Sequence, residues 1–142
     1  MVPTDLDERL RITAQTALRI AAGLAYFSHA TQKLFGWFGG FGPEHGAAEL
    51  MSRFGLAGVL ETVFATCLIL GLFTRAAAFL ASGEMAVTYF WIHWGGSGKM
   101  WWWQNFGELP LLYAFIWFFY FAWGAGPISL DAWLRRRRAV AT

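Results

Sequence analysis

Four long runs of apolar residues are the feature that most constrains how this chain can fold. They span residues 14–35, 56–73, 76–94 and 106–125. Each run approaches the length of about 20 helical residues that crosses a hydrocarbon layer of about 30 Å. The apolar residues are continuous, and backbone inside a bilayer must hydrogen-bond within its own segment, so the runs are expected to be helices. The sequence therefore predicts an all-α fold, a four-helix transmembrane bundle.

The balance of apolar and charged residues supports a membrane setting for these helices. Apolar residues make up 57% of the chain and charged residues 14%, whereas soluble domains carry about 25% charged residues. The formal net charge of +2 is too small to indicate nucleic acid as a partner, so membrane lipids are the expected surroundings. The composition does not shift along the 142 residues, which predicts a single domain over 1–142.

The positions of the basic residues predict the orientation of the bundle. Eight of the eleven flank the first run, mark the turn before the third run or follow the fourth. These eight are Arg9, Arg11, Arg19, Arg75 and Arg135 to Arg138, and the other three are Lys33, Arg53 and Lys99. The positive-inside rule places the larger group, and with it both termini, in the cytoplasm. The polar stretch before the first run favours a retained helix over a signal peptide.

The connections between the runs predict one tight turn and two short interfacial helices. Almost no residues separate the second run from the third, so these two are expected to form an antiparallel hairpin. Pro43 and Glu44 are typical first-turn residues and predict a short helix over 43–54 on the outer surface. On the inner side, Ser129 is the expected N-cap of a surface helix that carries Trp133 and the final arginines.

Polar residues inside the runs form the candidate site. An ionisable side chain within a spanning helix costs roughly 2.5–3.5 kcal/mol, so each needs a partner, a wet cavity or a function. The candidates are His29, Lys33, Glu61, Glu84, Asn105 and Glu108. All except Glu84 are expected at similar depth near the outer surface, and His29 and Lys33 share one helix face.

Two interpretations of this cluster stay open. In a structural one, Lys33 pairs with Glu61 or Glu108 and Asn105 caps the fourth helix, which fixes the helix register. In a functional one, His29 and a glutamate exchange protons with a redox-active or lipophilic molecule such as a quinol.

Glu84 poses a separate question, because it lies near the middle of the third run. A carboxylate at this depth without a cation must be neutral or reach water. Thr88, one helical turn on, is a candidate hydrogen-bond partner. A proton-relay role for Glu84 is the functional alternative to a buried neutral side chain.

No motif identifies a catalytic unit or an intrinsic cofactor. Cys67 lies alone in an apolar run, without a second cysteine for a disulfide or a CxxC pair. His29 and His93 lie toward the outer ends of their helices, where they could form an axial ligand pair for a haem. No haem signature accompanies them. Walker, GxGxxG, nucleophile-elbow and HExxH patterns are missing from the sequence, and no metal site is predicted. Whether the chain is an enzyme stays open.

Several segments, in their order and spacing, point to a known family. They are RIAAGLAYFSHATQKLFGWFGGFG at 19–42, LETVFATCLILGLFTRAAA at 60–78, Met85, and NFGELPLLY followed by GAGPISLD within 105–131. In this pattern the chain resembles the DoxX family of small four-helix membrane proteins. The family's usual His-Gly pair is replaced here by His29 and Ala30, which alters local packing. The resemblance implies a multi-pass protein of the bacterial cytoplasmic (inner) membrane.

The resemblance also implies a function. Family members are similar to components of membrane oxidoreductase systems, including a subunit of thiosulfate:quinone oxidoreductase. The expected role is a membrane subunit of an electron-transfer or quinone-linked oxidoreductase complex, with an outer-leaflet polar site, quinone as the bound molecule and other subunits as partners. The alternative is a non-catalytic accessory or assembly subunit of a larger membrane complex. A third hypothesis, a small transporter or proton-conducting bundle, rests on Glu84 and Glu108 alone.

Overall fold

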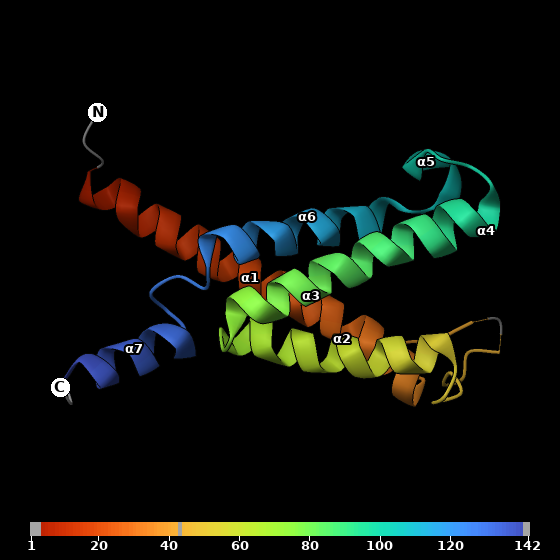
Figure 1. Ribbon diagram of the computed structural model, residues 1–142, viewed down its shortest axis with the longest axis horizontal. Helices are drawn as coiled ribbons and strands as arrows, with labels where there is room; N and C mark the ends of the chain where they lie inside the picture. The colour runs from red at the N-terminus through yellow and green to blue at the C-terminus, as the bar shows by residue number, and fades with distance from the viewer. Residues whose placement is uncertain (1–3, 43, 141–142) are drawn as a thin grey trace.

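The computed structural model describes residues 4–42 and 44–140, and all regular elements in this part of the chain are helical (Figure 1). The elements are α1 (Asp5–Phe35), α2 (Arg53–Leu70), α3 (Thr74–Val87), the π-helix η1 (Thr88–Trp94), α4 (Gly95–Ser97), α5 (Trp102–Asn105), α6 (Glu108–Trp123) and α7 (Leu130–Val140). Because α3, η1 and α4 follow one another directly, they form one helical rod. The all-α prediction is confirmed, and each predicted run is helical over most of its length.

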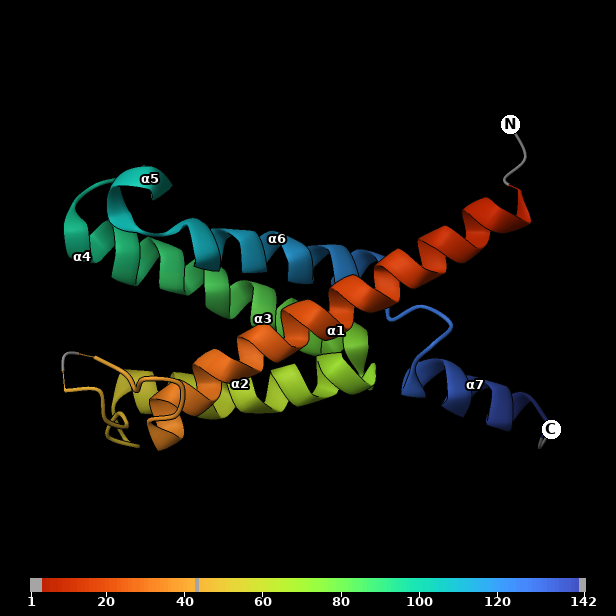
Figure 2. The same ribbon diagram turned by 180° about the vertical axis from the view of Figure 1, so that it is seen from behind.

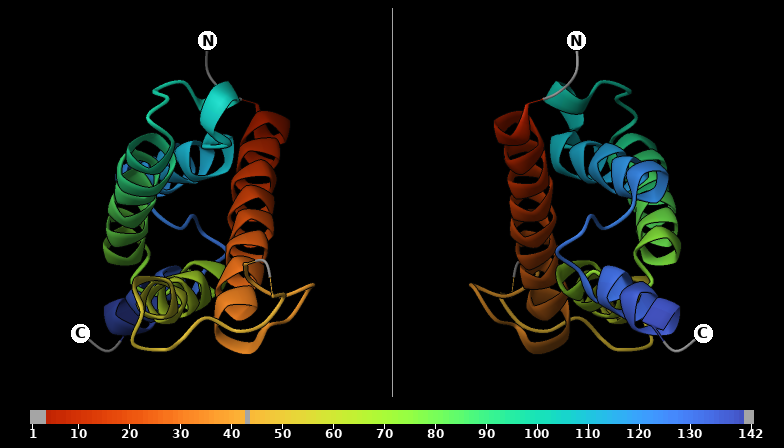
Figure 3. Two further views of the ribbon diagram at one scale, coloured as in Figure 1. Left: turned by 90° about the vertical axis from the view of Figure 1, so that its right-hand side faces the viewer. Right: turned by 90° about the vertical axis from the view of Figure 1, so that its left-hand side faces the viewer.

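The four long segments run alternately up and down. α1 packs mainly on α2 and α3 mainly on α6, and α2 also packs on α3. Figure 3, viewed along the long axis, shows α1, α2, α3 and α6 arranged around a common centre. The start of α1 and the whole of α7 lie at one end of the bundle, whereas residues 36–42 and 44–52, α4 and α5 lie at the other (Figures 1 and 2). We call these the α7 end and the α5 end.

The side chains are distributed in the opposite sense to those of a soluble bundle. The centre is filled by small residues and by aromatic residues with a polar atom, among them Ala65, Ala78, Ala81, Tyr26, Tyr113, Trp117 and Tyr120. On the outside, Leu24, Val63, Phe79 and Phe115, one from each long helix, are 55%, 52%, 57% and 67% exposed. Soluble monomers rarely carry apolar surface on this scale, and small residues between helices are typical of membrane bundles.

Length and composition single out one membrane-spanning helix in the described part of the chain. α2, with 18 residues, is both long and apolar enough to cross a bilayer. α6 is apolar but shorter, with 16 residues. The third run is divided between α3 and η1, and α1 begins with a charged turn. By this criterion alone, one span is supported and not the four that were predicted.

α1 begins earlier than the first apolar run, at Asp5 instead of near residue 14. The cause is a capping box: Oγ1 of Thr4 accepts a hydrogen bond from the backbone N–H of Asp7 at 3.2 Å, and the Asp7 carboxylate accepts one from the backbone N–H of Thr4 at 2.9 Å. The hydrogen bonds that the backbone N–H and the hydroxyl of Thr4 donate to the Asp7 carboxylate lower the pKa of that carboxyl. The polar first turns are therefore stabilised by local hydrogen bonds and not by burial.

The outer connection departs from its prediction. A helix over 43–54 was expected, but residues 44–52 contain turns and bends, and helical structure begins only at Arg53. Pro43 lies outside the described residues. The backbone hydrogen bonds go elsewhere: the N–H of Phe41 donates to the carbonyl of Gly46 at 2.8 Å, and that of Ala48 donates to the carbonyl of Lys33 at 2.7 Å. This prediction was wrong because Phe41 pairs with Gly46 and Ala48 bonds to the last turn of α1, in place of the hydrogen bonds of a helix.

The helix predicted after the fourth run is confirmed as α7. Oγ of Ser129 accepts a hydrogen bond from the backbone N–H of Ala132 at 3.2 Å, as expected of an N-cap. α7 carries Trp133, and the guanidinium of Arg137 lies 4.2 Å from the centre of its ring. The arginines of this helix are exposed at the α7 end.

The predicted hairpin between the second and third runs is also confirmed, and it depends on Gly71. α2 ends at Leu70 and α3 begins at Thr74. Gly71 has φ +65°, in the left-handed region that glycine tolerates. A Cβ at this position would lie 2.5 Å from Cβ of Ser129 and 2.9 Å from Nη1 of Arg19. The turn therefore has no room for a side chain.

Arg19 of α1 closes the α2 side of this turn. Its side chain is buried, with 2% of the residue exposed. Nη1 donates hydrogen bonds to the carbonyl oxygens of Leu68 and Ile69 at 2.6 and 2.7 Å, and Nη2 donates to that of Ile128 at 2.7 Å. The last carbonyls of a helix have no partner inside it, and a cation there is favoured by the helix dipole. Arg19 thus caps the C-terminus of α2.

Asp131 of α7 closes the α3 side of the same turn. Its Oδ1 accepts a hydrogen bond from the backbone N–H of Phe73 at 2.8 Å, and its Oδ2 accepts one from that of Thr74 at 2.9 Å. An anion at a helix N-terminus is favoured by the dipole. The hairpin is therefore held at both helix ends by residues from other helices.

Replacing Gly71 by alanine is expected to destabilise the bundle by roughly 2–4 kcal/mol, through the left-handed backbone and the close contact with Ser129. Equilibrium unfolding in mixed detergent micelles would measure this. Gly83→Ala is the matched control, because a Cβ there meets nothing within 4 Å and alanine is favoured inside a helix. Equal stability of the two variants would contradict the role given to Gly71.

Candidate functional site

A crevice of about 700 Å³ opens between α2 and the segment formed by α3 and η1. It lies toward the α5 end, since Phe41 and Phe54 at that end contribute to its wall. Most of the lining is apolar, with Leu60 on α2 and Trp91 on η1 among the larger side chains. The volume falls within the range of about 300–1,000 Å³ that is usual for small-molecule sites.

The π-helical geometry of η1 shapes one wall of this crevice. Trp91, Ile92 and His93 are consecutive in the chain, yet all three line it. In an α-helix, consecutive side chains point in directions about 100° apart. The wider turn of a π-helix changes this register, and such stretches are frequent at functional sites.

Four ionisable side chains line the crevice: Lys33 from α1, Arg53 from α2, Glu84 from α3 and His93 from η1. Nδ1 of His93 lies 2.9 Å from the carbonyl oxygen of Asn105, which makes Nδ1 the donor. The other ring nitrogen, Nε2, is then an acceptor. The crevice therefore offers an ammonium donor, a carboxylate and an imidazole acceptor within an apolar surround.

Lys33 is held by Glu61. The Lys33 ammonium forms a salt bridge with Oε1 of Glu61, so the pairing of Lys33 with Glu61 is confirmed. Glu61 is 1% exposed, and its Oε2 has no hydrogen-bond partner among the described residues. The ammonium thus compensates a buried carboxylate on one side and faces the crevice on the other.

Glu84 is hydrogen-bonded to Tyr26, which is not among the predicted site residues. The Tyr26 hydroxyl donates a hydrogen bond to Oε2 of Glu84 at 2.5 Å, whereas Thr88 was the expected partner. Oε1 of Glu84 is buried without a partner among the described residues. The ring of Tyr26 packs at 5.4 Å from that of Tyr113 and 5.6 Å from that of Trp117. A tyrosine in an apolar run usually needs a partner for its hydroxyl, which was the available signal.

The other predicted members lie outside the crevice. The ring of His29 lies 6.3 Å from that of Tyr113 on α6, with Nδ1 3.1 Å from Oε1 of Gln32. Glu108 is exposed in the first turn of α6. The predicted cluster is thus divided: Lys33, Glu61 and Glu84 lie together, and the other residues do not join them.

Asn105 does not line the crevice, but it contacts His93, which does. It is 5% exposed, and its carbonyl oxygen is the partner of His93. Its Oδ1 accepts a hydrogen bond from the backbone N–H of Gly107 at 2.8 Å. The N-cap of α6 is Gly107, two residues after Asn105 and without a side-chain hydrogen bond, so the predicted cap by Asn105 was wrong. Asn105 orders the turn before α6 instead.

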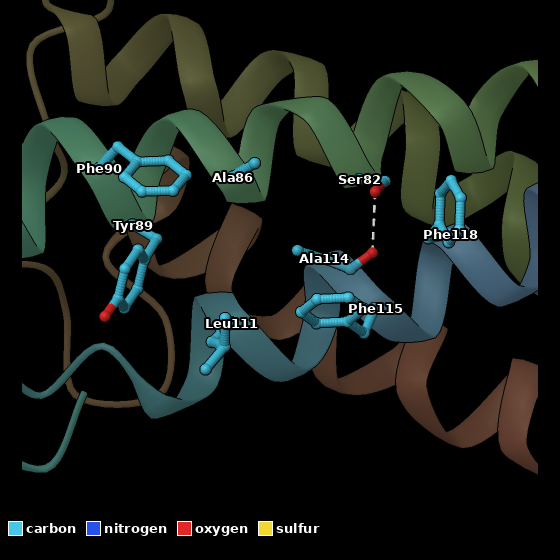
Figure 4. A pocket seen from close by; sticks show the side chains of 8 residues that line it. All are labelled: Ser82, Ala86, Tyr89, Phe90, Leu111, Ala114, Phe115 and Phe118. Carbon is cyan, nitrogen blue, oxygen red and sulfur yellow. Dashed lines mark hydrogen bonds between the residues drawn. The ribbon is translucent and has the colours of Figure 1, made fainter. Parts of the chain in front are cut away.

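A second crevice, of about 300 Å³, lies between α6 and the α3–η1 segment (Figure 4). The side chains drawn there are Ser82, Ala86, Tyr89 and Phe90 on one wall and Leu111, Ala114, Phe115 and Phe118 on the other. Oγ of Ser82 donates a hydrogen bond to the carbonyl oxygen of Ala114 at 2.8 Å, which joins the two helices. No charged side chain lines this crevice, so it offers shape and apolar contact only.

Comparison with known proteins identifies a family and a related protein. The family model described as DoxX matches residues 14–94, more than half of the chain. A protein of Haemophilus influenzae, described only as uncharacterized, is 48% identical over 77 residues, which are 54% of this chain and 58% of that protein. The chain thus covers little more than half the length of that relative. No solved structure matches the present chain. All four ionisable residues of the larger crevice lie within the matched segment.

Proposed function

Because this chain belongs to the DoxX family of membrane-associated proteins, we propose that it is a membrane subunit that binds a quinone for an electron-transfer complex. The quinone ring would occupy the crevice between α2 and η1, beside Lys33, Glu84 and His93. Its apolar tail would lie along the exposed surface of the helices. Electrons would pass to or from redox centres of a partner subunit.

The observation that carries this proposal is the presence of both donors and acceptors in one apolar crevice. The Lys33 ammonium donates, whereas the Glu84 carboxylate and Nε2 of His93 accept. An oxidised quinone presents carbonyl acceptors, and the reduced quinol presents hydroxyl donors. The crevice therefore has a complementary group for each redox form, and its apolar walls suit a planar ring.

A four-span arrangement in the membrane is part of the same proposal. Each long helix exposes large apolar side chains, and α3 and η1 together extend for about 30 Å at 1.5 Å per residue, the thickness of a hydrocarbon core. The eight basic residues of the larger group belong to the α7 end. By the positive-inside rule this end would face the cytoplasm of a bacterial inner membrane, and the crevice would lie toward the outer leaflet.

Replacing Glu84 by glutamine is expected to weaken quinol binding about tenfold, because a hydrogen bond to a carboxylate is stronger than one to an amide. Quinone binding should change much less, since a carbonyl cannot donate to Glu84. The measurement is a titration of the purified protein in nanodiscs with decylubiquinol and decylubiquinone. Tryptophan fluorescence reports occupancy, since Trp91 lines the crevice.

Glu108→Gln is the matched control for this titration. It makes the same chemical change on an exposed residue outside the crevice and should leave both affinities within about twofold. Equal losses in the two variants would contradict the proposal. So would the lack of saturable binding of either redox form.

A second candidate, a non-catalytic accessory or assembly subunit, is favoured by the smaller crevice. Ala86 and Ala114 line this crevice with small side chains, and Phe115 and Phe118 line it with large ones. Small residues of this kind allow a neighbouring transmembrane helix to approach closely. Ala86→Leu is expected to reduce co-purification of a partner subunit while quinone affinity stays unchanged. An unchanged set of co-purified proteins would count against this candidate.

A further inference from the structure

We propose that a cavity at the α7 end binds the phosphate group of an anionic phospholipid. The cavity, of about 460 Å³, lies between the start of α3, the end of α6 and α7. The lining residues that matter are Phe73, Arg75, Trp123, Gly124, Asp131 and Arg135. The inference rests on the membrane-spanning arrangement of the proposed function, which puts this cavity at the level of the lipid headgroups. It does not depend on quinone binding, which concerns the other end of the bundle.

The charges of the cavity favour an anion. Two cations, Arg75 and Arg135, line it, and Asp131 is its one carboxylate. Both oxygens of Asp131 already accept hydrogen bonds from the backbone of Phe73 and Thr74. The N-terminus of α3 adds partial positive charge at the same place. A phosphate would therefore meet an excess of positive charge.

Arg75 is positioned to bind a phosphate with two hydrogen bonds. Its Nη1 donates to the carbonyl oxygen of Phe121 at 2.8 Å, which holds the guanidinium against the end of α6. The opposite edge, Nε and Nη2, faces Gly124, where an added Cβ would lie 3.7 and 3.8 Å from these two atoms. Glycine, with φ +87°, leaves this edge uncovered. The planar edge of a guanidinium matches the spacing of two phosphate oxygens.

The apolar flanks of the cavity favour a lipid over free phosphate. Trp123 is 70% exposed and Phe73 is 68% exposed. Tryptophan side chains with this exposure are typical of the membrane interface at headgroup level. Beyond Trp123 lies the exposed apolar side of α6, along which acyl chains can pack. The ligand class that satisfies both parts is a molecule with an anionic phosphate and long apolar chains.

The remaining arginines of α7 strengthen the attraction without lining the cavity. Arg136, Arg137 and Arg138 are exposed on this helix, close to Arg135 in the chain. Clusters of basic residues next to a membrane attract anionic lipids to the adjacent leaflet. Because Asp131 of the same helix caps α3, α7 is fixed to the bundle in the position that brings Arg135 to the cavity.

The test is competitive lipid retention by the purified full-length chain, measured by native mass spectrometry. The detergent-solubilised protein is mixed with equal amounts of phosphatidylglycerol and phosphatidylcholine that have the same acyl chains. We expect phosphatidylglycerol to be retained about tenfold more, because it carries the net negative charge that the two arginines bind. Arg135→Gln should remove most of this preference. Arg135 makes no hydrogen bond with the described residues, so this variant should fold.

Arg138→Gln is the matched control, with the same change of charge on the same helix but outside the cavity, and it should keep the preference. Equal retention of the two lipids by the unmodified protein would overturn the inference. An equal loss of the lipid preference in Arg138→Gln would overturn it too, because the preference would then come from the general positive charge of α7 and not from the cavity. Displacement of phosphatidylglycerol by millimolar inorganic phosphate would reassign the cavity to free phosphate. Decylubiquinol titration of the same variants separates a failure here from a failure of the quinone proposal.

Discussion

Replacing Lys33 by alanine is expected to destabilise the bundle by about 3–5 kcal/mol, because it leaves the Glu61 carboxylate buried without a counter-charge. Glu61 is 1% exposed, and the Lys33 ammonium is the hydrogen-bond partner of its Oε1. Its Oε2 already lacks a partner among the described residues. Equilibrium unfolding in mixed micelles, followed by circular dichroism, would measure the loss.

Two further variants show whether the cost comes from the unpaired charge. Lys33→Met combined with Glu61→Leu removes both charges, and its stability should come within about 1 kcal/mol of the unmodified protein or exceed it. Arg9→Ala breaks the exposed pair of Arg9 and Asp5, whose side chains are 76% and 80% exposed, and should cost at most about 1 kcal/mol. If Lys33→Ala costs no more than Arg9→Ala, the pair with Glu61 does not hold the bundle together.

Replacing Arg19 by methionine is expected to cost roughly 3–5 kcal/mol, since three carbonyl groups lose charge-assisted hydrogen bonds in a buried position. Methionine keeps most of the side-chain volume, so the loss reports the hydrogen bonds and not a cavity. Arg19→Lys should recover part of the stability, because an ammonium keeps the charge but lacks the planar fork that reaches separate carbonyls.

Arg11→Met provides the control for Arg19. Arg11 lies two turns earlier on α1, is exposed and makes no hydrogen bond with the described residues. The expected change in the free energy of unfolding is within about 0.5 kcal/mol, as for other surface positions. Similar losses in the two variants would show that α1 tolerates no methionine there, which would contradict the capping role of Arg19.

The elements that the sequence predicts well are those whose signals are local. Continuous apolar runs mark the helices, the lack of residues between the second and third runs marks the hairpin, and Ser129 marks the start of α7. The helix over 43–54 failed because the backbone N–H of Ala48 bonds to the carbonyl of Lys33, at the end of α1, in competition with a helical bond within the segment. No local pattern records that competition.

The sequence named candidate site residues but could not say which neighbours each of them contacts. His29 and Lys33 lie one turn apart on α1, yet His29 packs toward Tyr113 of α6 while the longer Lys33 side chain reaches Glu61 on α2. Spacing along one helix says which side chains share a face, but not which neighbour that face meets. The bond between Tyr26 and Glu84 joins residues 58 apart in the chain, and only the packed bundle brings them together.

The way Asp131 caps α3 has a consequence for how the protein is made. Asp131 follows Phe73 by 58 residues, so the hairpin is synthesised long before the side chain that completes it. At about 5–20 residues per second, the ribosome needs roughly 3–12 s to cover that distance. During that time we expect the backbone N–H groups of Phe73 and Thr74 to lack their hydrogen bonds to Asp131. Nascent chains stalled before residue 131 should accordingly be cleaved by protease at the hairpin turn faster than chains stalled after α7.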